Sequence, residues 1–268
     1  MQRVCLPDTD LSISRFSFGT ANLHHIGGRK KQTAHLMSAA DVGFSHFDTA
    51  PLYGFGEAER ALGIAFGGLE NITIATKVGL YPPGGSDQGR ASMFARKVAG
   101  KVICPLSRAI VDLSVKRASL SVEGSLKRLR RTRLDLLLLH EANINLLNSD
   151  EWQRWQENFR DKVRWIGVAG PAATVEPFLK SQSPIAQIVQ VRDGLTTHEA
   201  DVVGAAGRSL QLTYGYFSSG AVQNLGEDVL REALLRNSTG SVLVTTRQTH
   251  RLATFARIAN GSIGREVS

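Results

Sequence analysis

Short apolar runs alternate along this chain with stretches of helical periodicity. Eight runs rich in branched or aromatic side chains predict strands at residues 15–18, 44–48, 72–77, 134–139, 163–168, 186–190, 210–214 and 242–245. Eight stretches between or after them, with apolar residues three or four positions apart, predict helices at 31–42, 57–66, 115–130, 149–159, 172–180, 196–207, 227–237 and 249–260. This alternation predicts parallel strands joined by crossover helices.

Eight strand–helix units in 268 residues match the size of a (β/α)₈ TIM barrel, an α/β fold, better than a doubly wound sheet of five or six strands. One domain, residues 1–268, then accounts for the whole chain. Apolar segments at 3–6 and 11–13 flank the turn-forming residues 7–10, which predicts a short N-terminal β-hairpin over the base of the barrel.

Two stretches lack helical or strand periodicity and follow predicted strands. The longer, 79–112, contains Pro82 and Pro83, and its length favours a lid or binding loop over a disordered insertion. The shorter, 218–226, follows the seventh predicted strand.

Composition and charge narrow the class of protein. The chain is 42% hydrophobic and 21% charged, as globular domains are, and its net charge of +8 suits anionic ligands without specifying one. The basic run 127–133 closes a predicted helix, so we expect a solvated helix end and no nucleic-acid partner. Cys5 and Cys104 stand in no CxxC or Cys/His pattern, so neither a disulfide nor a metal site is predicted. With no signal core and no run long enough to cross a bilayer, we expect a cytoplasmic protein with no membrane partner.

Polar side chains follow three consecutive predicted strands. Asp48 and Tyr53 come after the second strand, Lys77 ends the third and His140 follows the fourth. Because catalytic groups in such barrels lie at the carboxyl ends of strands, we expect these four side chains to meet.

These four residue types suit a site that donates a proton to a carbonyl oxygen. A tyrosine, with a reference pKa near 10, is a poor acid at neutral pH unless its anion is stabilised, and Lys77 is expected to provide that stabilisation and so lower the pKa of Tyr53. Asp48 would keep the lysine charged, and His140 would orient and polarise the carbonyl. A single Asp or Lys at a strand end is more often half of a structural ion pair, but the set of four favours a catalytic site. Such a site supplies a proton and no reductant.

The segments that carry these residues resemble the signature segments of the aldo-keto reductase family, in its order. They are residues 48–54 with Glu57, 76–79 and 134–140, with further matches at 18–21, 121–129 and 166–168. The resemblance implies a nicotinamide cofactor, NADP(H) with NAD(H) possible, and Tyr53 as acid in a tetrad of Asp48, Tyr53, Lys77 and His140.

The same resemblance implies a set of cofactor-binding residues. Gln190 matches the glutamine that binds the carboxamide, Tyr214 the aromatic residue that stacks on nicotinamide, and Thr20 and Asp48 fall at cofactor positions. The segment 245–252 matches the one that receives the adenosine phosphate, where Arg247, helped by Arg251, would bind a 2′-phosphate.

The chain also departs from the family pattern around the cofactor. Residues 169–171 read Ala-Gly-Pro where the family usually has Ser-Asn, and Thr254 and Phe255 replace a Glu-Asn pair that commonly binds adenine. The connection 220–227 is shorter than the usual cofactor-strap loop, and the chain stops eight residues after Asn260. We therefore expect weak cofactor retention.

The leading hypothesis is an NADP-dependent oxidoreductase that interconverts a small-molecule carbonyl and an alcohol or polyol, with no oligomeric state specified. The region 77–112 resembles that of bacterial aldose and pyridoxal dehydrogenases in the family, which favours a polar, polyhydroxylated substrate. The alternative is a catalytically weak or inactive binding or regulatory protein; a sugar-phosphate isomerase is a distant third. Glu141 is expected either to touch substrate hydroxyls or to pair with a loop arginine. His24 and His25 are equally consistent with the entrance of a substrate pocket and with a solvent-exposed loop.

Overall fold

Eight parallel strands close into a barrel in a computed structural model that describes residues 1–85, 109–217 and 226–261. In chain order they are β3 (Phe16–Gly19), β4 (His46–Asp48), β5 (Thr73–Val78), β8 (Leu134–His140), β9 (Val163–Gly170), β10 (Ile188–Arg192), β11 (Leu212–Tyr214) and β12 (Ser241–Val244). The last strand pairs with the first, Val242 opposite Phe16, and this pairing closes the ring. All eight predicted strands are present, and the predicted (β/α)₈ barrel is confirmed.

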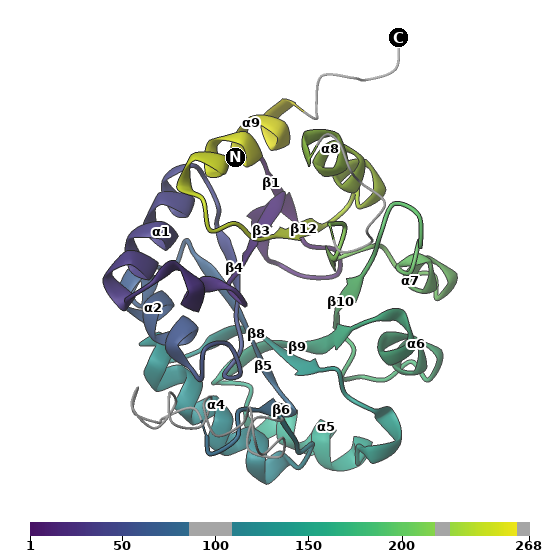
Figure 1. The fold of residues 1–268 in the computed structure, drawn as a ribbon. Helices are drawn as coiled ribbons and strands as arrows, with labels where there is room; N and C mark the ends of the chain where they lie inside the picture. The colour runs from purple at the N-terminus through teal and green to yellow at the C-terminus, as the bar shows by residue number, and fades with distance from the viewer. Residues whose placement is uncertain (86–108, 218–225, 262–268) are drawn as a thin grey trace, which may run out of the picture.

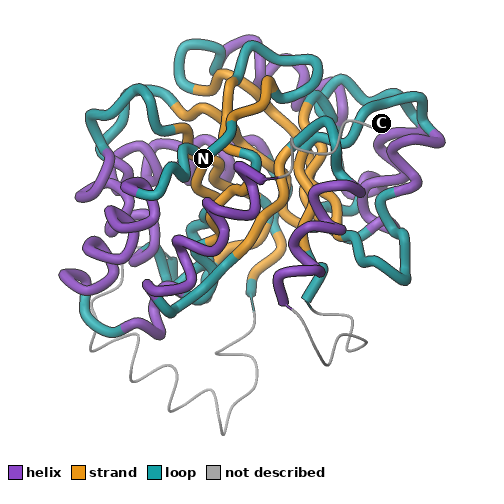
Figure 2. The backbone as a smooth tube through the Cα atoms, turned by 90° about the horizontal axis from the view of Figure 1, so that it is seen from above, coloured by secondary structure: helices purple, strands orange, loops and turns teal. Residues whose placement is uncertain are grey.

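Helices surround the strands as an outer layer (Figures 1 and 2). They are α1 (Arg29–Asp41), α2 (Glu57–Phe66), α4 (Val115–Leu129), α5 (Ser149–Asn158), α6 (Ala172–Lys180), α7 (Asp201–Ala205), α8 (Gly226–Arg236) and α9 (Leu252–Gly261), with 3₁₀ turns η1 (Leu23–Ile26), η3 (Ile144–Leu146) and η4 (Thr249–Arg251). The predicted helix 196–207 is shortened to α7, because His198 has φ +49° and residues 204 and 207, within and after α7, are glycines, poor helix formers.

The helix α4 illustrates how local sequence fixes an element. Ser114 caps its first turn by accepting a hydrogen bond from the Arg117 amide at 3.3 Å. Val122 and Leu129 on its apolar stripe are fully buried. The helix ends at Arg130, whose left-handed φ of +55° turns the chain toward β8.

The predicted hairpin is present and plugs the barrel. Strands β1 (Arg3–Cys5) and β2 (Ser12–Ser14) pair antiparallel. Leu6, Leu11 and Ile13 from this hairpin join one buried cluster with the inward-facing Leu136 and Leu138 of β8. One end of the barrel is thus filled, and the strands' carboxyl ends remain for a site.

The long irregular stretch 79–112 is described only at its ends. There β6 (Leu80–Tyr81) pairs antiparallel with β7 (Ile110–Val111). Residues 86–108, with Cys104, and 218–225 lie outside the described residues, so the predicted lid and the shortened strap stay predictions.

The basic run 127–133 is solvated only in part. Lys127, Arg130 and Arg133 are exposed, as expected, whereas Arg128 and Arg131 make internal contacts. Arg128 is buried and donates from Nε to Glu59 Oε2 at 2.7 Å. Arg131 donates to the carbonyls of Leu69 and Ile72, each at 2.8 Å, and to Asp135 at 3.1 Å. These hydrogen bonds connect the end of α4 with α2 and with the start of β5.

The described helices include none that is both long and apolar enough to cross a membrane. That residues 1–268 make up a single domain stays a prediction.

Candidate active site

Asp48 and Lys77 form a buried ion pair at the carboxyl ends of β4 and β5. The Lys77 Nζ donates to Asp48 Oδ2 at 2.6 Å and to the Thr49 carbonyl at 3.0 Å. Both side chains are almost fully buried. The ammonium also lies 5.0 Å from the centroid of the Tyr53 ring. The structure thus brings three of the four predicted residues together.

A left-handed turn carries Tyr53 to this pair. Residues 54 to 56 have φ values of +60°, +57° and +81°, and two of them are glycines, which adopt such values at low cost. A Cβ on Gly54 would lie 3.2 Å from the side chain of His24, so the turn is also tightly packed. The turn directs the chain back over the barrel mouth before α2 begins.

His140 completes the predicted tetrad from the end of β8. Its ring meets the Tyr53 ring edge to face, with centroids 6.0 Å apart and an interplanar angle of 89°. Its Nδ1 is buried and has no hydrogen-bond partner in the described part of the chain. Burial, reinforced by the charge of Lys77, lowers the pKa of His140 to about 3, so the ring is neutral at physiological pH.

The pKa of Tyr53 depends on burial as well as on the charges beside it. Burial would lower the pKa of Lys77, but Asp48 and Tyr53 beside it raise that pKa above its ordinary value. Burial also raises the pKa of Tyr53, and Lys77 offsets only part of this effect. Lys77 thus lowers the pKa of Tyr53 as expected, but the net pKa is raised, because burial outweighs the lysine and the site is drier than the sequence indicates.

A cavity of about 360 Å³ opens above the four side chains. Gln190 from the middle of β10 and Tyr214 from the end of β11 also line it. The Gln190 Oε1 is buried and has no partner among the described residues, so it is available to a ligand. Ala169 and Gly170, where the family usually has hydrogen-bonding side chains, line the wall with no polar side-chain atom.

A second cavity of about 670 Å³ adjoins the first and lies against α8, β12 and α9. Gly215, Leu243, Val244 and Thr245 line both cavities. Arg251 lines the second cavity, as do Thr254 and Phe255.

Two predicted cofactor residues are not part of either lining. Arg247 is exposed and is not among the residues that line the cavities. Thr20 is buried, and its Oγ1 donates to the Asp48 carbonyl at 2.9 Å, so it supports the main chain that carries Asp48.

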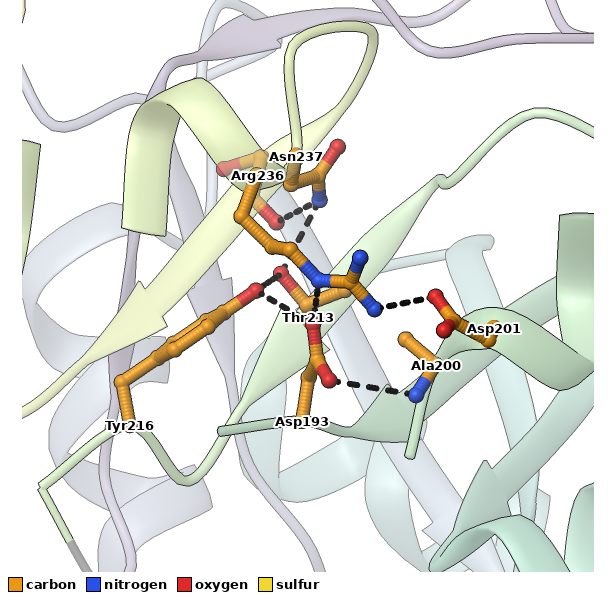
Figure 3. Close-up of polar contacts among 8 residues, drawn as sticks. Asp193, Ala200, Asp201, Thr213, Tyr216, Arg236 and Asn237 are labelled. Atoms are coloured by element: carbon orange, nitrogen blue, oxygen red, sulfur yellow. Dashed lines mark hydrogen bonds and ion pairs between the residues drawn. The ribbon is translucent and has the colours of Figure 1, made fainter. Parts of the chain in front are cut away.

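A polar network of Asp193, Tyr216 and Arg236 joins the end of β10 to the segment after β11 and to α8 (Figure 3). The Asp193 amide donates to the Tyr214 carbonyl at 2.7 Å, and Asp193 Oδ2 accepts from the Tyr216 hydroxyl at 3.0 Å and from Arg236 Nε at 2.9 Å. Gly215 between the two tyrosines has φ +104°, and a Cβ there would lie 2.8 Å from Arg192 Cγ. The segment is therefore fastened on both sides of Gly215, at the junction of the two cavities.

Two buried polar residues, His46 and Glu59, are not among the predicted site residues. His46 stands two positions before Asp48 on β4, so both point into the barrel, and its Nδ1 bonds Thr73 Oγ1 at 2.8 Å. Glu59 accepts a hydrogen bond at 2.7 Å from the Oγ1 of Thr76, the residue that precedes Lys77 in the chain. The spacing of two residues from Asp48 along a strand could have predicted that His46 points into the barrel. No local sequence pattern predicts the contacts of Glu59.

The remaining predicted site residues differ in whether they line the first cavity. His24 and His25 stack at 3.9 Å but are not among the residues that line the first cavity, whereas the neighbouring Asn22 is. Glu141 lines that cavity. Trp152 and Trp155 pack edge to face and are buried, as expected of core residues.

This chain is similar in sequence and in fold to known proteins. The model of the aldo/keto reductase family matches residues 15–191. The aldo-keto reductase YhdN of Bacillus subtilis (strain 168) is 28% identical over 178 residues, 63% of this chain and 47% of that protein. Pyridoxal 4-dehydrogenase of Microbacterium luteolum is 26% identical over 159 residues, 52% of this chain and 43% of that protein. The chain thus spans about half the length of these curated relatives. The solved structure of a glycerol dehydrogenase from Gluconobacter oxydans shares the fold, with a TM-score of 0.73 at 18% identity over 99% of this chain and 91% of that one.

Proposed function

The chain belongs to the aldo/keto reductase family, and on that premise we propose that it is an NADP-dependent oxidoreductase that interconverts an aldehyde or ketone and the corresponding alcohol. The observation that carries the proposal is the convergence of Tyr53, Lys77, Asp48 and His140 on one cavity, which adjoins a second and larger one. The first cavity has room for a small carbonyl compound beside a nicotinamide ring.

The residues present fit a nicotinamide cofactor. The unpartnered Gln190 Oε1 would accept from a carboxamide, and the Tyr214 ring would stack on the nicotinamide. The second cavity would take the adenosine end, with Arg251 at its wall. When bound, the cofactor exchanges a hydride with the substrate carbon.

Tyr53 serves as the general acid in reduction and the general base in oxidation. Its raised pKa keeps the proton on the hydroxyl until the carbonyl oxygen gains charge. An alkoxide is a stronger base than a phenolate, so proton transfer from Tyr53 is still favourable. Lys77, held charged by Asp48 at 2.6 Å, stabilises the phenolate left behind.

His140 orients the carbonyl as a neutral ring. With a pKa of about 3 the imidazole has one N–H and no charge, so it donates a hydrogen bond to the substrate oxygen and does not compete with Tyr53 as an acid.

These pKa directions predict how the rate depends on pH. For reduction, Tyr53 has to be protonated and His140 neutral, and both conditions hold from about pH 5 to about pH 9. We expect kcat/KM for reduction to be flat over this range. Oxidation needs the Tyr53 phenolate, so its rate should rise by about tenfold per pH unit over the same range. An inflection of the reduction profile near pH 6.5 that is absent in His140→Asn would contradict the assignment.

The protein is expected to discriminate between NADPH and NADH. A charge-assisted bond to the 2′-phosphate contributes about 1.5–3 kcal/mol, so we expect NADPH to bind ten- to hundredfold more tightly than NADH. Because Arg251 lines the second cavity and Arg247 does not, Arg251→Ala should remove most of this preference and Arg247→Ala less of it. Quenching of the three tryptophans during NADPH and NADH titrations measures both dissociation constants. Equal affinities in the unaltered protein would refute the preference.

The substrate is proposed to be a polar, hydroxylated carbonyl compound. The match to a pyridoxal 4-dehydrogenase supports this class, and glyceraldehyde with NADPH is a suitable first assay. Production of the alcohol, lost in Tyr53→Phe, tests the proposed function.

A second candidate function is a binding or regulatory protein that retains the tetrad. The wall at Ala169 and Gly170, which has no side-chain hydrogen bonds to offer, favours it, as do Thr254 and Phe255 in the second cavity. Micromolar NADPH binding with turnover supports the enzyme, whereas no binding at millimolar NADPH supports the second candidate.

A further inference from the structure

The first cavity has one uncompensated charge among the described residues that line it. Asp48 and Lys77 neutralise each other at 2.6 Å, and His140, with a pKa lowered by burial to about 3, is neutral. The remaining ionisable carboxylate in the lining is Glu141. Tyr53 is protonated and uncharged before reduction. The Glu141 carboxylate therefore determines the net charge of the cavity that a substrate enters.

The backbone places Glu141 at the mouth. It follows His140 directly, and its amide donates to the Ala169 carbonyl at 2.8 Å. Its φ of +50° lies in the left-handed region, which is unfavourable for a residue with a Cβ. The chain therefore turns sharply after β8 at Glu141, which is exposed and lines the cavity.

The charge of Glu141 acts on the groups around the cavity. Burial raises the pKa of Tyr214, and after burial Glu141 makes the largest contribution in the same direction. The nearby cation Arg192 donates from Nε to both carboxylate oxygens of Glu199 at 3.0 Å, and this bond raises its pKa more than the charge of Glu141 does. Across the described residues, Glu141 takes part in no ion pair.

We propose that Glu141 is a specificity-determining residue that admits neutral polyhydroxylated or cationic carbonyl compounds and disfavours those that bear a carboxylate or phosphate. Its oxygens accept hydrogen bonds from substrate hydroxyls, whereas an anionic substituent meets a like charge. For two unit charges about 6 Å apart, an effective dielectric between ~20 and ~80 makes this repulsion worth roughly three- to hundredfold in kcat/KM. The inference rests on the proposed carbonyl reduction.

Two matched substrate pairs test the proposal. Glyceraldehyde is compared with glyceraldehyde 3-phosphate, and butanal with succinic semialdehyde, each with NADPH. We expect the unaltered protein to prefer the neutral member of each pair and Glu141→Gln to reduce that preference at least threefold, by raising kcat/KM for the anion. The preference should weaken between 20 mM and 0.5 M NaCl in the unaltered protein and not in the variant.

Glu70→Gln is the matched control, because it removes an exposed carboxylate that follows α2 and lies outside the cavity lining. It should leave the substrate preference unchanged. An identical preference in Glu141→Gln and in the unaltered protein overturns the proposal.

A binding measurement separates this proposal from the proposed function. Ligand-observed NMR gives dissociation constants for butyrate and butyramide, which differ in charge and not in size, without turnover. If no carbonyl is reduced, the proposed function fails, and a butyramide preference lost in Glu141→Gln still upholds the charge selection. Equal binding of both ligands to the unaltered protein overturns the charge selection, whatever the turnover.

Discussion

Tyr53→Phe is expected to reduce kcat for carbonyl reduction by roughly 10³- to 10⁴-fold, because it removes the acid that protonates the substrate oxygen. The phenyl ring keeps its edge-to-face contact with His140 and its place 5.0 Å from the Lys77 ammonium. The loss should therefore lie in the chemical step and not in folding or cofactor binding. Steady-state kinetics with glyceraldehyde measures the loss of activity.

Three controls accompany this variant. The melting temperature and the NADPH dissociation constant should stay close to those of the unaltered protein. His140→Ala should lose less activity, about 10²- to 10³-fold, since it removes a polarising group and leaves the acid in place. Retention of more than about a tenth of kcat by Tyr53→Phe would reject Tyr53 as the acid.

The largest expected loss of stability comes from Glu59→Ala. Glu59 is fully buried and accepts from Arg128 Nε and Thr76 Oγ1, each at 2.7 Å. Its removal leaves the Arg128 guanidinium buried without its carboxylate, which costs about 3–5 kcal/mol of the free energy of unfolding. For a chain of this size the melting temperature should fall by roughly 6–20 °C.

A surface pair provides the matched control for this variant. Glu123 pairs with Lys162 between side chains that are 43% and 44% exposed. Glu123→Ala should cost less than about 1 kcal/mol, because water solvates the remaining charge. The double replacement Glu59→Leu with Arg128→Met should recover most of the stability lost in Glu59→Ala. Calorimetry that finds equal small losses for Glu59→Ala and Glu123→Ala would contradict the account.

The barrel could be predicted because its signals are local. Most strands are apolar runs, and several helices have an apolar stripe such as that of Val122 and Leu129 in α4. The one large error in helix length is at α7, where the predicted helix ran through His198 and Gly207, whose positive φ values are not helical. Periodicity records which face is buried, and it does not record whether the backbone stays helical.

That Asp48, Tyr53, Lys77 and His140 lie together could also be predicted, since strand ends that meet are a property of the fold. What the sequence did not show is pairing between distant side chains. Glu59 and Arg128 lie 69 positions apart, and Asp193 and Arg236 lie 43 positions apart. The pKa of Tyr53 was misjudged for the same reason, because it depends on burial by the whole barrel mouth as well as on Lys77.

Hydride transfer into a carbonyl compound tests the central claim most directly. NADPH deuterated at C4 of the nicotinamide ring is incubated with the protein and glyceraldehyde, and the alcohol is analysed by mass spectrometry. We predict that the product carries deuterium on the former carbonyl carbon, in step with cofactor oxidation, and that Tyr53→Phe forms almost none of it. Cofactor oxidation without labelled alcohol, or equal labelled product from Tyr53→Phe, would contradict the account.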